Sequence, residues 1–231
     1  MELLECKHLC KSYDDTPFLK DINLKIERGK IIGILGKNGV GKSTLIKIIN
    51  DLLVPTEGEV YINGEKPGVN SKKTIAYLPE RTYLDKEMKI IEVFHYFEEF
   101  YDNFNIEKAK KLLKDLDLDI NKKISKMSKG MQEKLQLVLV MSRDADLYIL
   151  DEPLGGVDPA TRDYILDTIL SNFKEGASMI ISTHLISDIE RILDEVIFMN
   201  DGEIILTSPA DELREKEKGS IDEIFRRYFK C

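Results

Sequence analysis

The clearest chemistry in the chain belongs to one glycine-rich segment, Gly36-Lys37-Asn38-Gly39-Val40-Gly41-Lys42-Ser43-Thr44. It follows the spacing of a phosphate-binding loop, G-x-x-x-x-G-K-[ST]. Glycines permit the turns that point backbone N–H groups towards a polyphosphate. Lys42 can place a positive charge on the β- and γ-phosphates, and the Ser43 hydroxyl can bind Mg²⁺. The segment therefore predicts a site for a nucleoside triphosphate.

Two carboxylates, Asp151 and Glu152, follow a second apolar run at residues 147–150. A carboxylate at a strand end beside the phosphate loop can hold the magnesium shell, and this role falls to Asp151. The next residue, Glu152, can act as the general base that polarises a water for in-line attack on the γ-phosphate. The alternative is an acidic helix cap after a strand, and the phosphate loop makes the catalytic interpretation the favoured one.

These side chains require strands and helices to position them. The run 31–35 is short and apolar and ends at the glycine loop, which is typical of a strand buried on both faces of a parallel sheet. Residues 42–53 then predict a helix whose N-terminus faces the phosphates. Runs 147–150 and 178–182 also predict strands, with a helix between them over 160–173.

The flanking segments predict further elements. Segments 3–9, 21–26 and 58–62 are β-like, Asn63-Gly64 is a hairpin signal, and residues 195–206 form a second hairpin. Residues 84–143 are charged and helical in pattern. Within them five aromatic residues recur near helical spacing, and this stripe is either a packing face or a docking groove for another protein. The stripe comprises Phe94, Phe97, Phe100, Tyr101 and Phe104.

Composition narrows the class of protein. The chain has 231 residues, 42% of them hydrophobic, which is ample for one domain, and its net charge of −8 disfavours nucleic acid as a partner. No apolar run approaches the ~20 residues that span a bilayer. The N-terminus lacks the apolar core of a signal peptide. The three cysteines have no zinc-site spacing, so we expect reduced thiols in a soluble protein.

Four further motifs resemble those of the ATP-binding cassette (ABC) family. Ser128-Lys129-Gly130-Met131-Gln132 is similar to the LSGGQ-type signature, and Gly155-Gly156-Val157-Asp158 resembles the D-loop. His184 follows a predicted strand at the position of the family's switch histidine. Tyr13 precedes the phosphate strand, as does the aromatic that stacks on adenine in this family. The resemblance runs in order from Leu3 to Leu206.

The resemblance implies a role for each matching residue. Tyr13 would stack on the base of ATP, and residues 36–44 would cradle its phosphates. Ser128 and Gly130 would contact the γ-phosphate held by the other subunit of a head-to-tail dimer. Asp158 would help to join the two sites. His184 would contact the γ-phosphate and position the attacking water, beside Glu152 and Lys42.

The sequence departs from the family pattern in two motifs. Glu80 stands where the family has the glutamine of its Q-loop. A carboxylate can still bind Mg²⁺, so Glu80 joins Ser43 and Asp151 as an expected metal ligand, but it adds negative charge near the γ-phosphate. The signature has Lys129 and Met131 in place of glycine and glutamine. Both departures resemble the subgroup that serves bacterial ABC-2-type exporters.

We therefore expect an α/β fold, with a P-loop NTPase (RecA-like) core, an antiparallel β-subdomain and a helical subdomain. The core and β-subdomain would take residues 1–82 and 144–210, and the helical subdomain 83–143. A tail over 211–231 would be helical. It contains five apolar or aromatic positions that either cover the core or contact a partner: Ile221, Ile224, Phe225, Tyr228 and Phe229.

The expected function is that of the ATP-binding and hydrolysing subunit of a transporter, with ATP and Mg²⁺ as cofactors. Two cassettes, identical or different, would power export through separate integral-membrane permease subunits, at the cytoplasmic face of the cell membrane. No nucleic acid is expected as a partner. The alternatives are a soluble ABC ATPase that acts on nucleic acid or in translation, and a regulator that binds ATP without useful hydrolysis.

Overall fold

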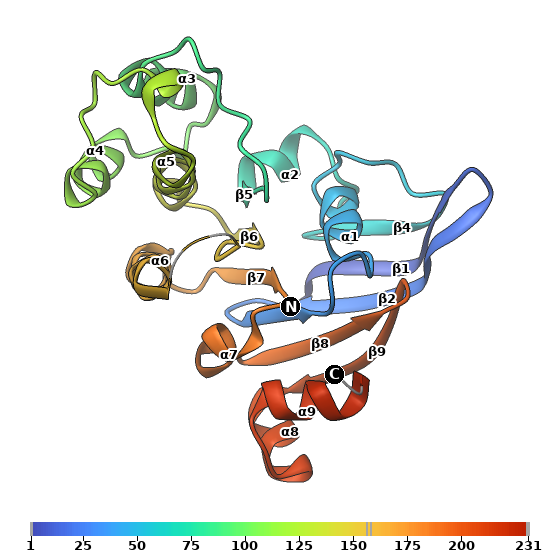
Figure 1. Ribbon diagram of the computed structural model, residues 1–231. Helices are drawn as coiled ribbons and strands as arrows, with labels where there is room; N and C mark the ends of the chain where they lie inside the picture. Colours follow the sequence, from blue (N-terminus) through green and yellow to red (C-terminus); the bar gives the residue numbers. More distant parts are fainter. Residues whose placement is uncertain (1, 156, 158, 230–231) are drawn as a thin grey trace.

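The computed structural model describes residues 2–155, 157 and 159–229, which form two sheets with helices around them (Figure 1). The strands are β1 (Glu2–Tyr13), β2 (Thr16–Glu27), β3 (Ile31–Leu35), β4 (Glu57–Ile62), β5 (Ile75–Leu78), β6 (Leu147–Asp151), β7 (Ser178–Thr183), β8 (Glu195–Asn200) and β9 (Glu203–Pro209). The helices are α1 (Lys42–Ile49), α2 (Val69–Thr74), α3 (Ile90–Phe100), α4 (Ile106–Asp115), α5 (Lys129–Met141), α6 (Pro159–Asn172), α7 (Ile186–Ile189), α8 (Ala210–Glu217) and α9 (Ile221–Phe229). Short 3₁₀ turns are η1 (Ile124–Lys126) and η2 (Glu190–Ile192).

The larger sheet has the strand order β5-β6-β7-β3-β8-β9. Its first five strands are parallel, and β9 pairs antiparallel with β8. The carboxyl ends of parallel strands lie at one edge of a sheet, which is where open α/β sheets bind ligands. The loops after β3, β5, β6 and β7 therefore meet at the same edge. This confirms the predicted α/β class.

Both faces of the central strands are buried, as their continuous apolar runs predict. Ile34 on β3 and Ile149 on β6 belong to a core shared with α1 and the small sheet. Tyr148 and Leu150, which alternate with Ile149 along β6, belong to a second core formed with helices on the opposite face. Successive side chains along each strand point alternately into the two cores, so each central strand is packed on both faces.

The smaller sheet is antiparallel, in the order β2-β1-β4, and its apolar side chains cover α1. One local prediction here is confirmed and one is wrong. Asn63 and Gly64 form the predicted two-residue turn, both with positive φ, and the backbone hydrogen bonds exchanged by Ile62 and Glu65 close it. The helix predicted over residues 42–53 ends at Ile49, because the Asn50 amide bonds the Ile46 carbonyl and the next residue turns to positive φ.

Helices α3, α4 and α5 lie together beyond the β5 edge of the large sheet (Figure 1). The aromatic stripe there divides in two. Phe94, Phe97 and Phe104 are buried, which confirms a packing face, whereas Phe100 is 60% exposed beside the exposed Tyr96.

The C-terminal tail packs as two helices beside β8 and β9 (Figure 1). Phe225 and Phe229 contact Phe198 of β8, so α9 covers the core. Of the two alternatives for the tail, covering the core or contacting a partner, the structure shows the first. Within the described ranges, the structure contains no helix with the length and apolar character needed to cross a membrane.

Candidate nucleotide-binding and hydrolysis site

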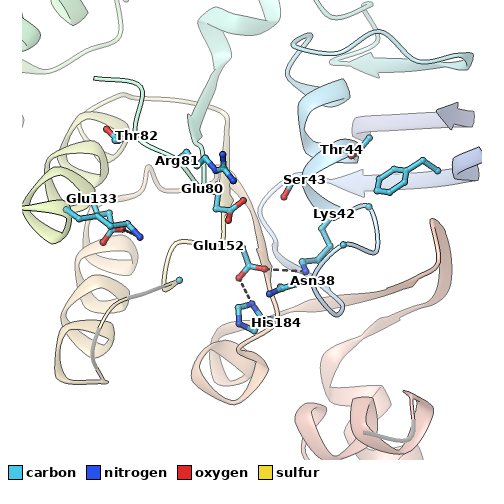
Figure 2. A pocket seen from close by; sticks show the side chains of 15 residues that line it. Asn38, Lys42, Ser43, Thr44, Glu80, Arg81, Thr82, Glu133, Glu152 and His184 are labelled. Atoms are coloured by element: carbon cyan, nitrogen blue, oxygen red, sulfur yellow. Dashed lines mark hydrogen bonds and ion pairs between the residues drawn. The ribbon is translucent and has the colours of Figure 1, made fainter. Parts of the chain in front are cut away.

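A cavity of about 860 Å³ opens at the carboxyl edge of the large sheet (Figure 2). The phosphate loop forms one wall, and the loops after β5, β6 and β7 form the floor and the opposite side. The start of α5 closes the remaining side. The lining residues are Phe18, Asn38, Gly39, Gly41, Lys42, Ser43, Thr44, Glu80, Arg81, Thr82, Lys129, Glu133, Glu152, Gly155 and His184.

Backbone geometry explains the glycines of the phosphate loop. Gly39 and Gly41 have φ values of 83° and 111°, which disfavour a side chain, and Gly41 caps the N-terminus of α1. At Gly36 an added Cβ would lie 2.7 Å from the Met199 carbonyl oxygen. The loop therefore passes close to β8 and delivers a helix N-terminus to the cavity, an arrangement that favours a bound phosphate.

The Lys42 side chain is held within the loop and is only 5% exposed. Its Nζ donates hydrogen bonds to the carbonyls of Gly36, at 2.7 Å, and Lys37, at 3.1 Å. It also lies 3.3 Å from Oε1 of Glu152 (Figure 2). A buried cation is costly unless it is paired, so these contacts fix one positive charge beside the proposed phosphates.

Ser43 and Asp151 meet where α1 and β6 approach each other. The Ser43 hydroxyl donates to Oδ1 of Asp151 at 3.1 Å, and the Ser182 hydroxyl donates to the same oxygen at 2.5 Å. Burial raises the pKa of Asp151, and these two hydrogen bonds oppose that rise. A hydroxyl and a carboxylate are oxygen ligands that suit Mg²⁺, which usually takes only one or two carboxylates plus substrate phosphates. The pair fits such an ion.

Glu152 lies at the centre of the cavity floor. Its φ is 50°, which is uncommon for a residue other than glycine, and such strain concentrates at functional sites. Its Oε2 accepts a hydrogen bond from the Thr183 hydroxyl at 3.1 Å and lies 2.9 Å from Nδ1 of His184 (Figure 2). Glu80 is exposed to the cavity just beyond β5, the strand that pairs with β6. Glu152, His184 and Glu80 thus line the same cavity, and Glu152 and His184 are in contact.

Two groups of predicted residues lie away from the cavity wall. Tyr13 is 46% exposed and does not line the cavity; its ring packs edge-on against Phe18, with centroids 5.6 Å apart, and Phe18 is the aromatic on the wall. Gly36, Lys37 and Val40 belong to the phosphate loop but do not line the cavity; Gly36 and Val40 are buried, and Lys37 is exposed.

The signature segment begins α5. Ser128 is the N-cap, and its Oγ accepts a hydrogen bond from the Met131 N–H at 3.3 Å. Ser128 is exposed, and no atom of the residues that the structure describes lies within 4 Å of a Cβ built on Gly130, so both positions are open at the surface. Asp158 lies outside the described residues, so its predicted role has no structural counterpart here.

Several residues of the site were not among the predicted ones. Thr183 lies behind the cavity wall, where its hydroxyl donates a hydrogen bond to Glu152, and its place at the end of β7 was the available signal. Phe18, Arg81 and Glu133 enter the cavity through the folding of distant segments, and no spacing rule in the sequence singles them out.

Comparison with known proteins identifies the family. The ABC transporter family profile matches residues 19–155. The chain is 32% identical to the ABC-type transporter ATP-binding protein EcsA of Bacillus subtilis (strain 168), over 97% of this chain and 96% of that protein.

Two solved structures also resemble it. The ATP-binding subunit of an ABC transporter superposes with a TM-score of 0.88 at 28% identity, covering 97% of this chain and 98% of that one. A dimeric ATP-binding cassette in a post-hydrolysis state, bound to ADP and Pi, superposes with a TM-score of 0.79 at 25% identity, covering 90% and 99%. With the phosphate loop, Glu152 and His184 in one cavity, these similarities establish that the chain belongs to the ABC transporter family, as an ATP-binding and hydrolysing subunit.

Proposed function

We propose that hydrolysis of ATP at this site follows a division of roles among the residues around Glu152. Glu152 accepts a proton from the attacking water, and His184, 2.9 Å away, orients that water and the γ-phosphate. Lys42 neutralises charge on the β- and γ-phosphates. The observation that carries this proposal is the continuous chain Lys42–Glu152–His184, which joins the phosphate loop to the end of β7.

Magnesium completes the proposed site. Ser43 and Asp151 would hold the ion, and Glu80 would approach it from the loop after β5. When bound, Mg²⁺ offsets the negative charge of the phosphates and orients them. Tyr13, backed by Phe18, would stack on the base. Residues 36–44 would cradle the phosphates through backbone N–H groups.

The proposed active form is a head-to-tail dimer. Ser128 and Gly130 are accessible, and Gly130 has open space beside it, so a partner's nucleotide could approach the start of α5. The dimeric relative bound to ADP and Pi supports this arrangement. Asp158 is proposed to join the two sites, as its motif implies.

The proposed biological role is to drive separate integral-membrane permease subunits, in a homodimer or heterodimer of cassettes at the cytoplasmic face of the membrane. The helical subdomain over 83–143 and the Glu80 loop would transmit closure of the core, which takes residues 1–82 and 144–210, to those subunits. Export is the proposed direction, because Glu80, Lys129 and Met131 follow the ABC-2-type pattern.

Action on nucleic acid is the disfavoured alternative, since the net charge is −8 and such binding needs a basic surface. The deciding experiment is purification of the tagged chain from detergent-solubilised membranes of its own cell. Stoichiometric recovery of a multi-span protein, with ATP turnover, is expected. Recovery of nucleic-acid-associated proteins alone would overturn the transport role and leave the ATPase assignment standing.

A further inference from the structure

A second, small cavity lies directly behind the catalytic floor. Its volume is about 30 Å³, and its wall includes Gln136 of α5 together with Glu80, Glu133 and Glu152. One water needs roughly 10–15 Å³ of such space and two or more polar partners. The cavity is therefore large enough for a water and is lined by groups that can bond one.

Gln136 is the unusual member of this wall. It is a polar side chain only 2% exposed, in a stretch of α5 whose other buried residues, such as Leu135 and Leu137, are apolar. Its Nε2 is buried and has no hydrogen-bond partner among the described residues. A buried amide without a partner costs on the order of 1–3 kcal/mol, so its presence needs an explanation.

Glu152 offers the matching group from the other side of the same cavity. Its Oε2 is engaged by Thr183 and His184, but its Oε1 is buried and accepts no hydrogen bond from any residue the structure describes. Lys42 Nζ lies 3.3 Å from Oε1, at ion-pair distance but without hydrogen-bond alignment. Gln136 and Glu152, which carry a donor and an acceptor without hydrogen-bond partners among the described residues, thus line one cavity of water size.

We infer that Gln136 is a positioning residue for Glu152: its amide, through one ordered water, holds the Oε1 side of the carboxylate that the proposed function makes the general base. Gln136 and Glu133 lie on one face of α5, and Lys129 at the start of that helix lines the main cavity. The link therefore runs from the signature end of α5 to the base, and the inference rests on the proposed role of Glu152.

The test replaces the amide by an apolar side chain of similar length. For Gln136→Met we expect kcat for ATP to fall about ten-fold, because a hydrogen bond to a charged group is lost. KM and nucleotide affinity should not change, and Tm should stay constant or rise. The matched control is Leu135→Met, which alters a buried apolar residue of the same helix that lies on the wall of neither cavity and should retain full kcat. In Gln136→Glu a carboxylate replaces the amide, so the N–H donors are lost, and turnover should fall at least as far. This variant takes the place of Gln136→Met if Gln136→Met does not fold.

A purely structural glutamine gives a different result: kcat of Gln136→Met stays at the wild-type value, whether or not Tm changes, and this would overturn the inference. Single-turnover measurements on the Glu152→Gln background add a second check, since Gln136→Met should then cause no further loss; a further ten-fold loss would mean that Gln136 does not act through Glu152. If Glu152→Gln alone is fully active, the proposed function fails. If it is inactive and Gln136→Met is not impaired, only the positioning role fails.

Discussion

Nδ1 of His184 lies 2.9 Å from Oε2 of Glu152, although the two residues belong to different strand ends. The Thr183 hydroxyl donates to the same oxygen at 3.1 Å, so the carboxylate is oriented by two neighbouring residues at the end of β7. A carboxylate oriented by a second group in this way suits the proposed role of Glu152 as a general base.

The first prediction concerns Glu152, the proposed general base. Glu152→Gln keeps the shape of the side chain but removes its ability to accept a proton, so we expect ATP turnover to fall by about 10²–10⁴-fold. ATP binding should persist, and the variant should accumulate as an ATP-bound dimer. Phosphate release and size-exclusion chromatography with and without ATP measure the two effects. Full turnover in the variant would show that Glu152 is not the base.

The second prediction concerns His184, which contacts Glu152. His184→Ala removes a side chain that is 39% exposed, so Tm should barely change while kcat falls. The control is His95→Ala, which removes an exposed histidine whose described ion-pair partner is Glu98 on the same helix. Equal turnover in the two variants would contradict a catalytic contribution from His184.

The third prediction separates dimer contacts from folding. A Cβ at Gly130 meets nothing within 4 Å in the protomer, and alanine favours a helix by about 1 kcal/mol over glycine. Gly130→Ala should therefore raise Tm slightly but impair ATP-dependent dimerisation and turnover, because the added methyl group stands where the partner's nucleotide would approach. The control is Gly68→Ala, which also enters open space but lies away from the cavity. Wild-type turnover in Gly130→Ala would argue against this dimer interface.

Much of this fold was predictable from local pattern. The runs that became β3, β6 and β7 are continuous and apolar, and a strand buried on both faces needs little else. The loop glycines and the lysine were predictable because phosphate geometry constrains their spacing. In contrast, β5 is a four-residue strand paired only with β6, and nothing in Ile75–Leu78 distinguishes it from a short helical segment.

The contacts within the site were harder to predict than its members. Glu152 reaches His184 only because β6 and β7 are neighbours in the sheet, and strand order is not encoded in any local pattern. Phe18 rather than the predicted Tyr13 lines the cavity wall, and this difference likewise depends on how the β1–β2 turn packs. Gln136 shares a cavity wall with Glu152 through the packing of α5 beside the end of β6, and no local sequence pattern shows this proximity.

The fourth prediction follows from the burial of Cys6. Burial raises the pKa of its thiol to about 12, whereas Cys10 is half-exposed beyond the bulge at His8. The raised value favours the folded state at ordinary pH, and this contribution is lost as the pH rises from the usual 9.0 towards 12. In a variant with Cys10→Ser and Cys231→Ser, a thiol reagent at about pH 8 should label Cys6 only after unfolding. Rapid labelling of the native protein would contradict the buried position.

The fifth prediction concerns the joint between the helical segment and the core. Arg143 follows α5 and is only 4% exposed. Its guanidinium donates to the carbonyls of Ile75, at 2.6 Å, and Lys73, at 2.9 Å, and to Oδ1 of Asn103 at 3.0 Å. It also stacks 3.7 Å from the centroid of the Tyr101 ring. One planar group thus ties the ends of α2, α3 and α5 to the edge strand β5.

A lysine at this position keeps the charge but cannot reproduce the planar fork or the stacking. Arg143→Lys should therefore lower the free energy of unfolding by about 2–4 kcal/mol, since buried carbonyls lose their donors. Urea denaturation measures the change. The control is Arg191→Lys, an exposed arginine 3.8 Å from Asp163, which should shift stability by less than about 0.5 kcal/mol. If both variants unfold at the same urea concentration as the wild type, Arg143 does not stabilise the joint. If Arg143→Lys is destabilised but turns over ATP normally below its unfolding transition, the joint supports the fold without shaping the site.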